Sequence, residues 1–187
     1  MLIHKGTQVI ETERLILRRA VTEDAEPMYR NWASDQEVTR YLTWPPHENE
    51  AVSRKVIESW VHEYGNDHFY QWMIVLKDRK EPIGCISGMS PNDDLASVEI
   101  GYCIGHTWWN KGIMTEALQA VIHYLFTECG FRRIAAHHDP RNSYSGEVMK
   151  KCGMKLEGVL RQADRNNQGI CDAVQYAILL SEYSEKD

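Results

Sequence analysis

The spacing of apolar and polar residues predicts short strands in several parts of the chain. In the segment 12–20, Leu15 and Leu17 occupy alternate positions among mostly basic residues, which favours a first strand. Other β-rich runs are bounded by turn residues. They predict strands at 69–76, 82–89, 97–104, 134–138, 156–162 and 171–180, with turns at 77–81, 90–95 and 166–169.

A four-residue spacing of apolar side chains predicts helices between these strands. Val52, Val56, Trp60 and Tyr64 recur in this way in the segment 48–64. Further helices are expected at about 23–34, 111–129 and 142–152. The helix at 111–129 joins two strands, so those strands should be parallel with a right-handed crossover. We therefore expect a mixed α/β fold with helices on both faces of one sheet.

Length and composition favour one soluble domain. The 187 residues are 43% hydrophobic and 26% charged, which suits a single domain spanning 1–187 with a core at about 11–181. No apolar run approaches the roughly 18 residues of a membrane span. The first six residues lack a secretory apolar segment. We expect a cytoplasmic protein that does not contact membranes.

The net charge of −6, from 27 acidic and 21 basic residues, disfavours binding to nucleic acid. A negative surface weakly favours a cationic partner such as an amine.

The cysteines and histidines give little indication of crosslinks or metals. The five cysteines are scattered without a C-x-x-C pair, so we expect buried thiols rather than disulfides or a zinc site. His137 and His138 are adjacent on a predicted strand, where neighbouring side chains point to opposite faces. We therefore expect no metal ion.

The most informative segment is 101–117, where a strand leads through a loop into a helix. The first amides of a helix have no intrahelical partner, so such a start can bind an anion. Gly112 permits close approach of a ligand to the backbone, and Lys111 adds a positive charge. The alternative is an ordinary helix capped by Asn110.

This segment resembles the acetyl-CoA motif of the GNAT superfamily of N-acetyltransferases, Q/R-x-x-G-x-G/A. Here the motif reads Trp109-Asn110-Lys111-Gly112-Ile113-Met114, with Trp109 and Met114 departing from the pattern. Residues 13–18 are similar to the T-E-R-L-x-L-R opening of the branch that acetylates ribosomal-protein N-termini. Residues 83–84, 99–102, 142–145 and 149–158 also resemble that branch, in the same order. The resemblance spans about 11–181.

The resemblance implies a GNAT-like fold, with a mostly antiparallel sheet whose central parallel pair splays apart. It implies acetyl-CoA as co-substrate. Its pyrophosphate would be bound by loop amides of Trp109, Asn110, Lys111, Gly112, Ile113, Met114 and Thr115. The pantetheine arm would contact the backbone of Tyr102, Cys103 and Ile104, and also Asn142.

The reaction needs a base, because an α-amine has a pKa near 8. Asp164 occupies the position where the resembled branch has a Glu base, whereas Glu99 occupies the position used by other members. We favour Asp164 and leave Glu99 open, and either residue can also be an ordinary surface carboxylate. Met149 stands where many members have a tyrosine acid, whereas the resembled branch uses a serine at the position of Ser145, so the resemblance implies Ser145 as the acid. Ser145 can equally be a first-turn helix residue that satisfies backbone groups.

Direct transfer is favoured over an acetyl-cysteine on Cys103, because no basic residue at an obvious spacing would activate its thiol.

The loop at 41–47 is expected to line the acceptor site through Tyr41, Trp44 and His47, although packing beneath the first helices explains these residues equally well. The favoured acceptor is a protein N-terminal amine, as in ribosomal-protein acetylation. The alternatives are a small amine (a polyamine, amino acid or aminoglycoside) or a CoA-binding sensor without turnover. Similar proteins are commonly dimers, so a homodimer is possible.

Overall fold

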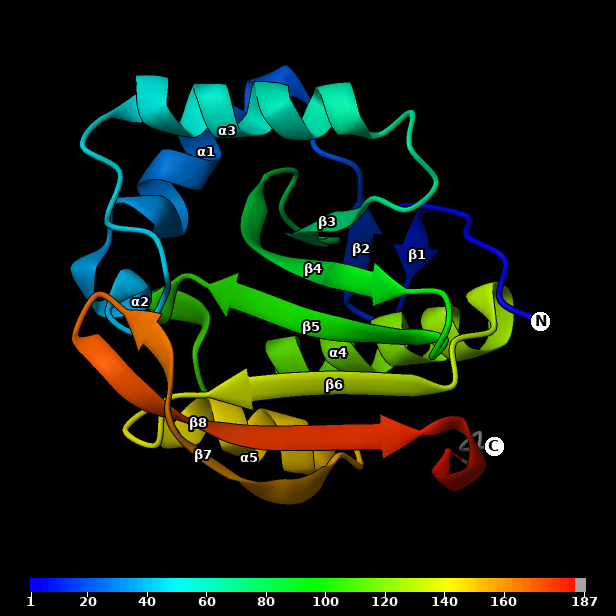
Figure 1. Cartoon of the computed structure of the whole chain (residues 1–187). Coiled ribbons are helices and arrows are strands. Elements are labelled where there is room, and N and C mark those ends of the chain that lie inside the picture. The colour runs from blue at the N-terminus through cyan, green and yellow to red at the C-terminus, as the bar shows by residue number, and fades with distance from the viewer. Residues whose placement is uncertain (184–187) are drawn as a thin grey trace.

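The computed structural model describes residues 1–183, and an eight-stranded sheet forms their centre (Figure 1). The strand order is β1-β2-β3-β4-β5-β6-β8-β7. The strands are β1 (Ile10–Glu11), β2 (Leu15–Arg18), β3 (Tyr70–Leu76), β4 (Pro82–Asn92), β5 (Ser97–Ile104), β6 (Arg133–His138), β7 (Lys155–Asn166) and β8 (Gly169–Leu179). The helices are α1 (Ala25–Met28), α2 (Gln36–Thr39), α3 (Glu50–Glu63), α4 (Ile113–Tyr124) and α5 (Ser143–Lys151).

All neighbouring strands are antiparallel except β5 and β6, which confirms the predicted parallel pair. This pair is joined only at its start, from Ser97 opposite Arg133 to Glu99 opposite Ala135. Beyond that point β5 continues to Ile104 and β6 to His138 without pairing to each other. The two strands therefore splay apart, as the resemblance implied.

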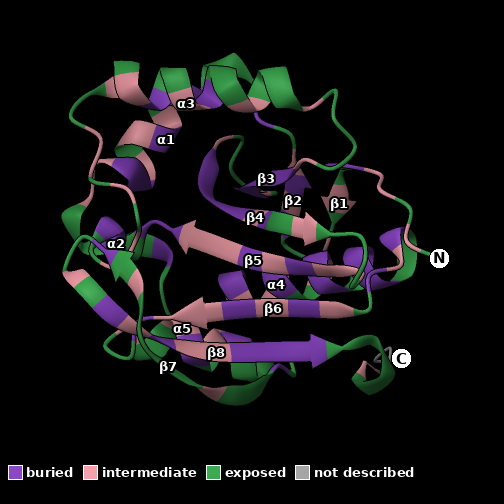
Figure 2. Ribbon diagram, viewed as in Figure 1, coloured by how far each residue is buried: buried purple, intermediate pink, exposed green. Residues whose placement is uncertain are grey.

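Helices cover both faces of the sheet, as predicted. In Figure 1, α4 and α5 lie behind the central strands, while α1 and α3 lie together at the other side near β3 and β4. The larger core packs α4 and α5 against the sheet through residues such as Ile100, Leu118 and Ile134. A smaller core lies under α1 and α3 and contains Trp32 and Ile57. Figure 2 shows buried residues along β3 and β8 and exposed residues on the outer side of α3.

Several element ends differ from the prediction for local reasons. The first strand is shorter than 12–20, because Thr12 and Leu15 form a turn in which the Thr12 hydroxyl accepts the Leu15 amide at 2.9 Å. β7 is longer than 156–162, because a bulge lets it continue to Asn166. Gln162 in this bulge has a φ of 51°. Such a bulge bends a strand and re-aims its side chains.

The cysteines form no disulfide within residues 1–183, as expected. No helix in this part of the chain is long and apolar enough to cross a membrane.

Candidate active site

A cavity of about 380 Å³ opens between the start of α4, the splayed end of β5 and the start of α5. It brings together residues that are far apart in the sequence. Its lining comprises Val38, Tyr41, Leu42, Tyr102, Cys103, Ile104, Trp108, Trp109, Asn110, Gly112, Ile113, Met114, Thr115, Asn142, Tyr144, Ser145, Glu147, Val148 and Lys151. Of the residues expected to contact the cofactor, only Lys111 lies outside this lining.

The start of α4 leaves its first backbone amides without a capping side chain from the described residues. Gly112 is the N-cap residue, with a φ of 71°, and no side chain in the described chain caps the helix. Asn110 is therefore not the cap, and its own φ of 59° makes it part of the tight loop before the helix. The first helical bond runs from the Glu116 amide to the Gly112 carbonyl at 3.1 Å. The amides of residues 113–115 precede this bond, so they are directed at the cavity entrance.

Two contacts hold this loop in shape. Arg14 donates to the Lys111 carbonyl at 3.0 Å and forms an ion pair with Glu116 at 2.6 Å. The Trp109 indole donates to the Ile104 carbonyl at 2.8 Å. Trp109, which departs from the family motif, therefore ties the loop to the end of β5.

The backbone of β5 presents alternate residues to the gap between β5 and β6. The Gly105 amide donates to Ile83 of β4 at 2.9 Å. Since backbone groups alternate along an antiparallel strand, Cys103 also faces β4, whereas Tyr102 and Ile104 face the gap. The expectation that all three would offer backbone groups to the pantetheine arm needs correction. Cys103 lines the cavity, and its sulfur lies against Cys85 of β4.

Ser145 and Tyr102 form a pair of hydroxyl groups on the cavity wall. The Ser145 hydroxyl donates to the Tyr102 phenol at 3.0 Å, and the phenol donates to the Ser145 backbone carbonyl at 3.0 Å. Asn142 begins α5 without a capping bond from its side chain to any described residue, so its amide group is available on the cavity wall. Met149 is buried in the core, which leaves no room for an acid at that position.

Glu99 and Asp164 lie outside the cavity lining, but both contact one histidine. His137 Nδ1 is 2.5 Å from Glu99 Oε1, and His137 Nε2 is 3.2 Å from Asp164 Oδ2. The hydrogen bond with His137 lowers the pKa of Glu99, and the same bond raises the pKa of His137. The sequence interpretation assigned His137 no chemical role. The two strands were predicted to be parallel neighbours, and His137 lies on the same face of them as Glu99. That shared face was the signal that could have identified His137.

The loop that precedes α3 carries the three residues that were expected to bind the acceptor. Tyr41 lines the cavity, whereas Trp44 and His47 do not. Trp44 packs against the smaller core, and His47 Nδ1 lies 2.7 Å from the Ser53 hydroxyl. Burial lowers the pKa of His47. A role of Trp44 and His47 in binding the acceptor stays a prediction.

Cys103 has a neighbour that sequence spacing did not reveal. Its sulfur lies 3.5 Å from that of Cys85 on the adjacent strand. This hydrogen bond and burial raise the pKa of Cys103 well above its ordinary value. A thiol that stays protonated is a poor nucleophile. The contact therefore argues against an acetyl-cysteine intermediate.

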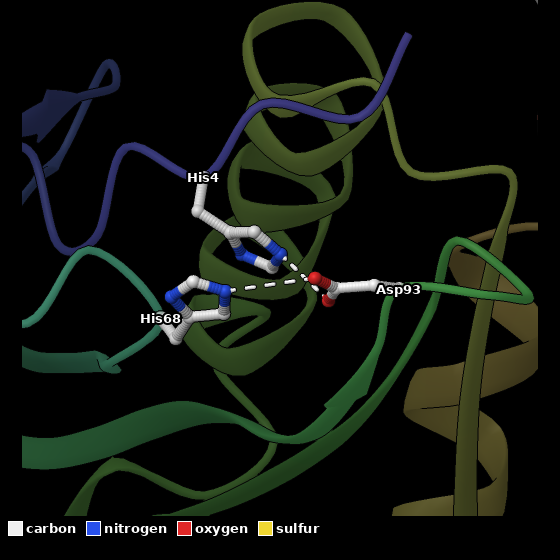
Figure 3. Close-up of side chains that lie close together, drawn as sticks. All are labelled: His4, His68 and Asp93. Carbon is white, nitrogen blue, oxygen red and sulfur yellow. Dashed lines mark hydrogen bonds and ion pairs between the residues drawn. The ribbon is translucent and has the colours of Figure 1, made fainter.

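His137 and His138 point to opposite faces, as predicted, because His138 stacks on Tyr176 rather than approaching Glu99. Within residues 1–183, one group of potential metal ligands has ligand atoms within 4.8 Å of one another: His4, His68 and Asp93. Figure 3 shows the two rings lying over each other beside the carboxylate.

The geometry of this group does not match a metal centre. Its two rings stack with their centres 3.7 Å apart at an angle of 24°. Two imidazoles on one zinc ion, each bound at about 2.0–2.1 Å, would instead diverge from the ion. The group holds the N-terminal segment against the β4–β5 turn, and the expectation of no metal stays a prediction.

Comparisons with known proteins agree with this geometry. A family model described as "Acetyltransferase (GNAT) domain" matches residues 14–155. The chain is 33% identical over 171 residues to "Uncharacterized N-acetyltransferase YoaA" of Bacillus subtilis, covering 91% of this chain and 96% of that protein. It is 28% identical over 177 residues to the ribosomal-protein-serine acetyltransferase of Escherichia coli, covering 93% and 98% respectively.

Among solved structures, a GNAT-family acetyltransferase from Bacillus anthracis superposes with a TM-score of 0.82 at 28% identity. The superposition covers 93% of this chain and 99% of that one. Because the family model spans most of the chain and the fold is shared over nearly all of it, this protein belongs to the acetyltransferase (GNAT) family.

Proposed function

We propose that this enzyme transfers the acetyl group of acetyl-CoA directly to the N-terminal α-amine of a protein, such as a ribosomal protein. The observation that carries the proposal is the continuity of one cavity. It runs from the uncapped start of α4, past the free edge of β5, to the loop that contains Tyr41. The start of α4 would bind the pyrophosphate, the unpaired end of β5 would bind the pantetheine arm, and the loop with Tyr41 would contact the amine. This order matches the order of the groups along acetyl-CoA and its acceptor.

The residues present fit both the pyrophosphate and the pantetheine arm of acetyl-CoA. The amides at 113–115 would bind the pyrophosphate, with Gly112 leaving the approach open and Lys111 and Lys151 adding positive charge. Both lysines are exposed at the loop and at the end of α5. Tyr102 and Ile104 would offer backbone groups to the pantetheine amides. The Asn142 side chain would contact the same arm.

In the proposed reaction, each proton that leaves the amine has an acceptor. The protonated amine loses one proton to a carboxylate, Asp164 in our preferred assignment or Glu99 in the alternative. The nitrogen then attacks the thioester carbonyl, and the carbon–sulfur bond breaks. The departing thiolate takes a proton from Ser145, and the second proton lost by the nitrogen replaces it. A backbone amide near Ile104 would stabilise the oxyanion.

The choice of a protein acceptor rests on two supports. The similarity to the Escherichia coli ribosomal-protein-serine acetyltransferase extends over nearly the whole chain. The cavity lining also includes Tyr41 and Leu42 of the loop before α3, along which a peptide acceptor would lie.

The test is release of CoA thiol from acetyl-CoA with a panel of amines at equal concentration. The panel contains peptides with the N-termini of ribosomal proteins, the same peptides with blocked N-termini, a polyamine, free amino acids and an aminoglycoside. We expect turnover with the unblocked peptides only. Turnover confined to a small amine would replace the protein acceptor. Tight acetyl-CoA binding without turnover on any amine would instead indicate a sensor.

A further inference from the structure

We propose that His137 accepts the proton lost by the amine, with Asp164 passing that proton to it and Glu99 holding its ring in the receptive tautomer. We call these three residues the carboxylate–histidine relay. The inference rests on the proposed function. It replaces the choice between Asp164 and Glu99 with one unit that uses both.

The relay lies where the two central strands begin to separate. Glu99 is the last residue of β5 that pairs with β6, and its partner there is Ala135. Side chains alternate along a strand, so His137, two residues beyond Ala135, points to the same face as Glu99. The bulge in β7 precedes Asp164 and bends that strand. Three elements therefore place one side chain each at the start of the gap.

We assign the neutral tautomer of His137 from the lengths of its two hydrogen bonds. A neutral imidazole has one N–H group and one lone pair. The shorter contact, 2.5 Å from Nδ1 to Glu99, suits the N–H group, which leaves the Nε2 lone pair facing Asp164 at 3.2 Å. A lone pair opposite a carboxylate is unfavourable until a proton lies between them. A proton released by the reaction and bound to Nε2 of His137 would turn this contact into a hydrogen bond with Asp164.

The proposed proton path has two transfers and returns the proton to water. The ammonium group gives a proton to Asp164, directly or through one water molecule, and the proton then moves to Nε2 of His137. The resulting imidazolium lies between two carboxylates. About 31% of the His137 side chain is exposed, so solvent can remove the proton before the next turnover.

The charges around His137 favour this role. Glu99 from β5 and Asp164 from β7 are the charged groups that act on it, and Gln175, opposite it on β8, is neutral. The pKa of His137 is raised above its ordinary value, mainly by the hydrogen bond with Glu99. The neutral, proton-accepting form therefore accumulates only as the pH rises through this raised pKa, above the ordinary histidine value of about 6.5. Catalytic efficiency should rise with pH through this ionisation.

The experiment compares the full-length wild type with His137→Gln, using the best amine from the panel between pH 6 and pH 9. His62→Gln, an exposed change on α3, is the matched control. We expect His137→Gln to lower kcat roughly 10²–10⁴-fold. The plot of catalytic efficiency against pH should also lose the inflection assigned to His137. Acetyl-CoA affinity should stay within about twofold, since the relay lies outside the cavity lining. The control should match the wild type.

Retention of the wild-type inflection, or a kcat within about threefold of wild type, would overturn the relay. A second measurement does not depend on the variant folding. Imidazole ¹⁵N shifts of the wild type above pH 8 should place the neutral proton on Nδ1, and a proton on Nε2 overturns the proposal. If the wild type itself turns over no amine, the proposed function fails, and the ¹⁵N result still decides the tautomer.

Discussion

Ser145 and Tyr102 are joined by two hydrogen bonds, one between their hydroxyl groups and one from the phenol to the Ser145 carbonyl. This double contact fixes the first turn of α5 against β5 at the wall of the cavity. Burial raises the pKa of Tyr102, so its phenol stays protonated near neutral pH. A thiolate released beside this pair would meet two hydroxyl groups rather than one.

Ser145→Ala should therefore slow turnover without weakening acetyl-CoA binding. We expect kcat to fall roughly 10–100-fold, at or below the low end of acid catalysis, because the Tyr102 phenol remains nearby. Tyr102→Phe should cost less, since it leaves the Ser145 proton in place. Steady-state kinetics and calorimetry separate the two effects. Ser143→Ala, on the exposed start of α5, is the control. An unchanged kcat in Ser145→Ala would remove Ser145 as the acid.

Asp164→Asn and Glu99→Gln should lower kcat by different amounts. In the proposed relay Asp164 receives the proton from the amine, so its loss should cost about 10²–10⁴-fold. Gln at position 99 can still accept from Nδ1 of His137, so Glu99→Gln should cost less. Adding His137→Gln to Asp164→Asn should lower kcat little further, because the residues act as one unit. An unchanged rate in Asp164→Asn would leave Glu99 as the base.

The fold was largely predictable because its longer elements follow local rules. The strand at 97–104 and the helix–strand crossover after it have clear periodic patterns, and the parallel pairing of β5 with β6 follows from them. The short helix α2 was missed because four residues carry no period. Its start depends on Asp35, whose side chain accepts the Glu37 amide at 2.9 Å.

The site was only partly predictable, because the relay depends on contacts between distant strands. Glu99, His137 and Asp164 meet only after β6, β7 and β8 have assembled, and a bulge in β7 affects the last of them. No spacing in the sequence contains that information. The helix start at Gly112 was predictable, since a glycine in this position acts locally, and its role in binding an anion stays a prediction.

Gly112→Leu should weaken CoA binding about tenfold or more. A non-glycine residue in the left-handed region costs roughly 1–2 kcal/mol, and a leucine side chain would also obstruct the phosphate approach. Gly112→Ala introduces most of the backbone strain with little side-chain bulk. Comparing it with Gly112→Leu separates the strain from the obstruction of the phosphate approach. Gly153→Ala, at a φ of 83° after α5, tests strain away from the site. Normal affinity of Gly112→Leu by calorimetry would count against the anion seat.

The ion pair between His137 and Glu99 should make stability depend on pH in a defined window. His137 has a raised pKa, so its contribution is complete below about pH 6.5 and is lost as pH rises through the raised value. Glu99 has a lowered pKa, so its contribution is present above about pH 4.3 and is lost as pH falls through the lowered value. Both contributions are present together near pH 5.5.

Urea unfolding of the wild type and His137→Gln at pH 5.5 and pH 8.5 tests this window. Because both side chains are about one-third exposed, the difference at pH 5.5 should be at most about 1 kcal/mol. It should shrink at pH 8.5 and in 1 M salt. A difference that is equal at both pH values would show that His137 stabilises the fold by packing rather than by charge.

Asn167→Ala should weaken acceptor binding more than donor binding. The Asn167 side chain donates to the carbonyls of Thr39 and Trp44 at 2.8 and 2.7 Å, and its backbone amide donates to Leu42 at 3.1 Å. The β7–β8 turn thus holds the loop that carries Tyr41 to the cavity. Each of the two side-chain bonds is worth about 0.5–1.5 kcal/mol, so the KM for the amine should rise roughly threefold to tenfold.

Binding of acetyl-CoA gives the internal reference for Asn167→Ala, because the loop at 39–44 is remote in sequence from the Gly112 loop, where we place the pyrophosphate. The Kd of acetyl-CoA should therefore stay near the wild-type value. Gln168→Ala removes an exposed side chain from the same turn and should leave both constants unchanged. Equal weakening of amine and acetyl-CoA binding by Asn167→Ala would mean that the turn supports the whole cavity rather than its acceptor wall.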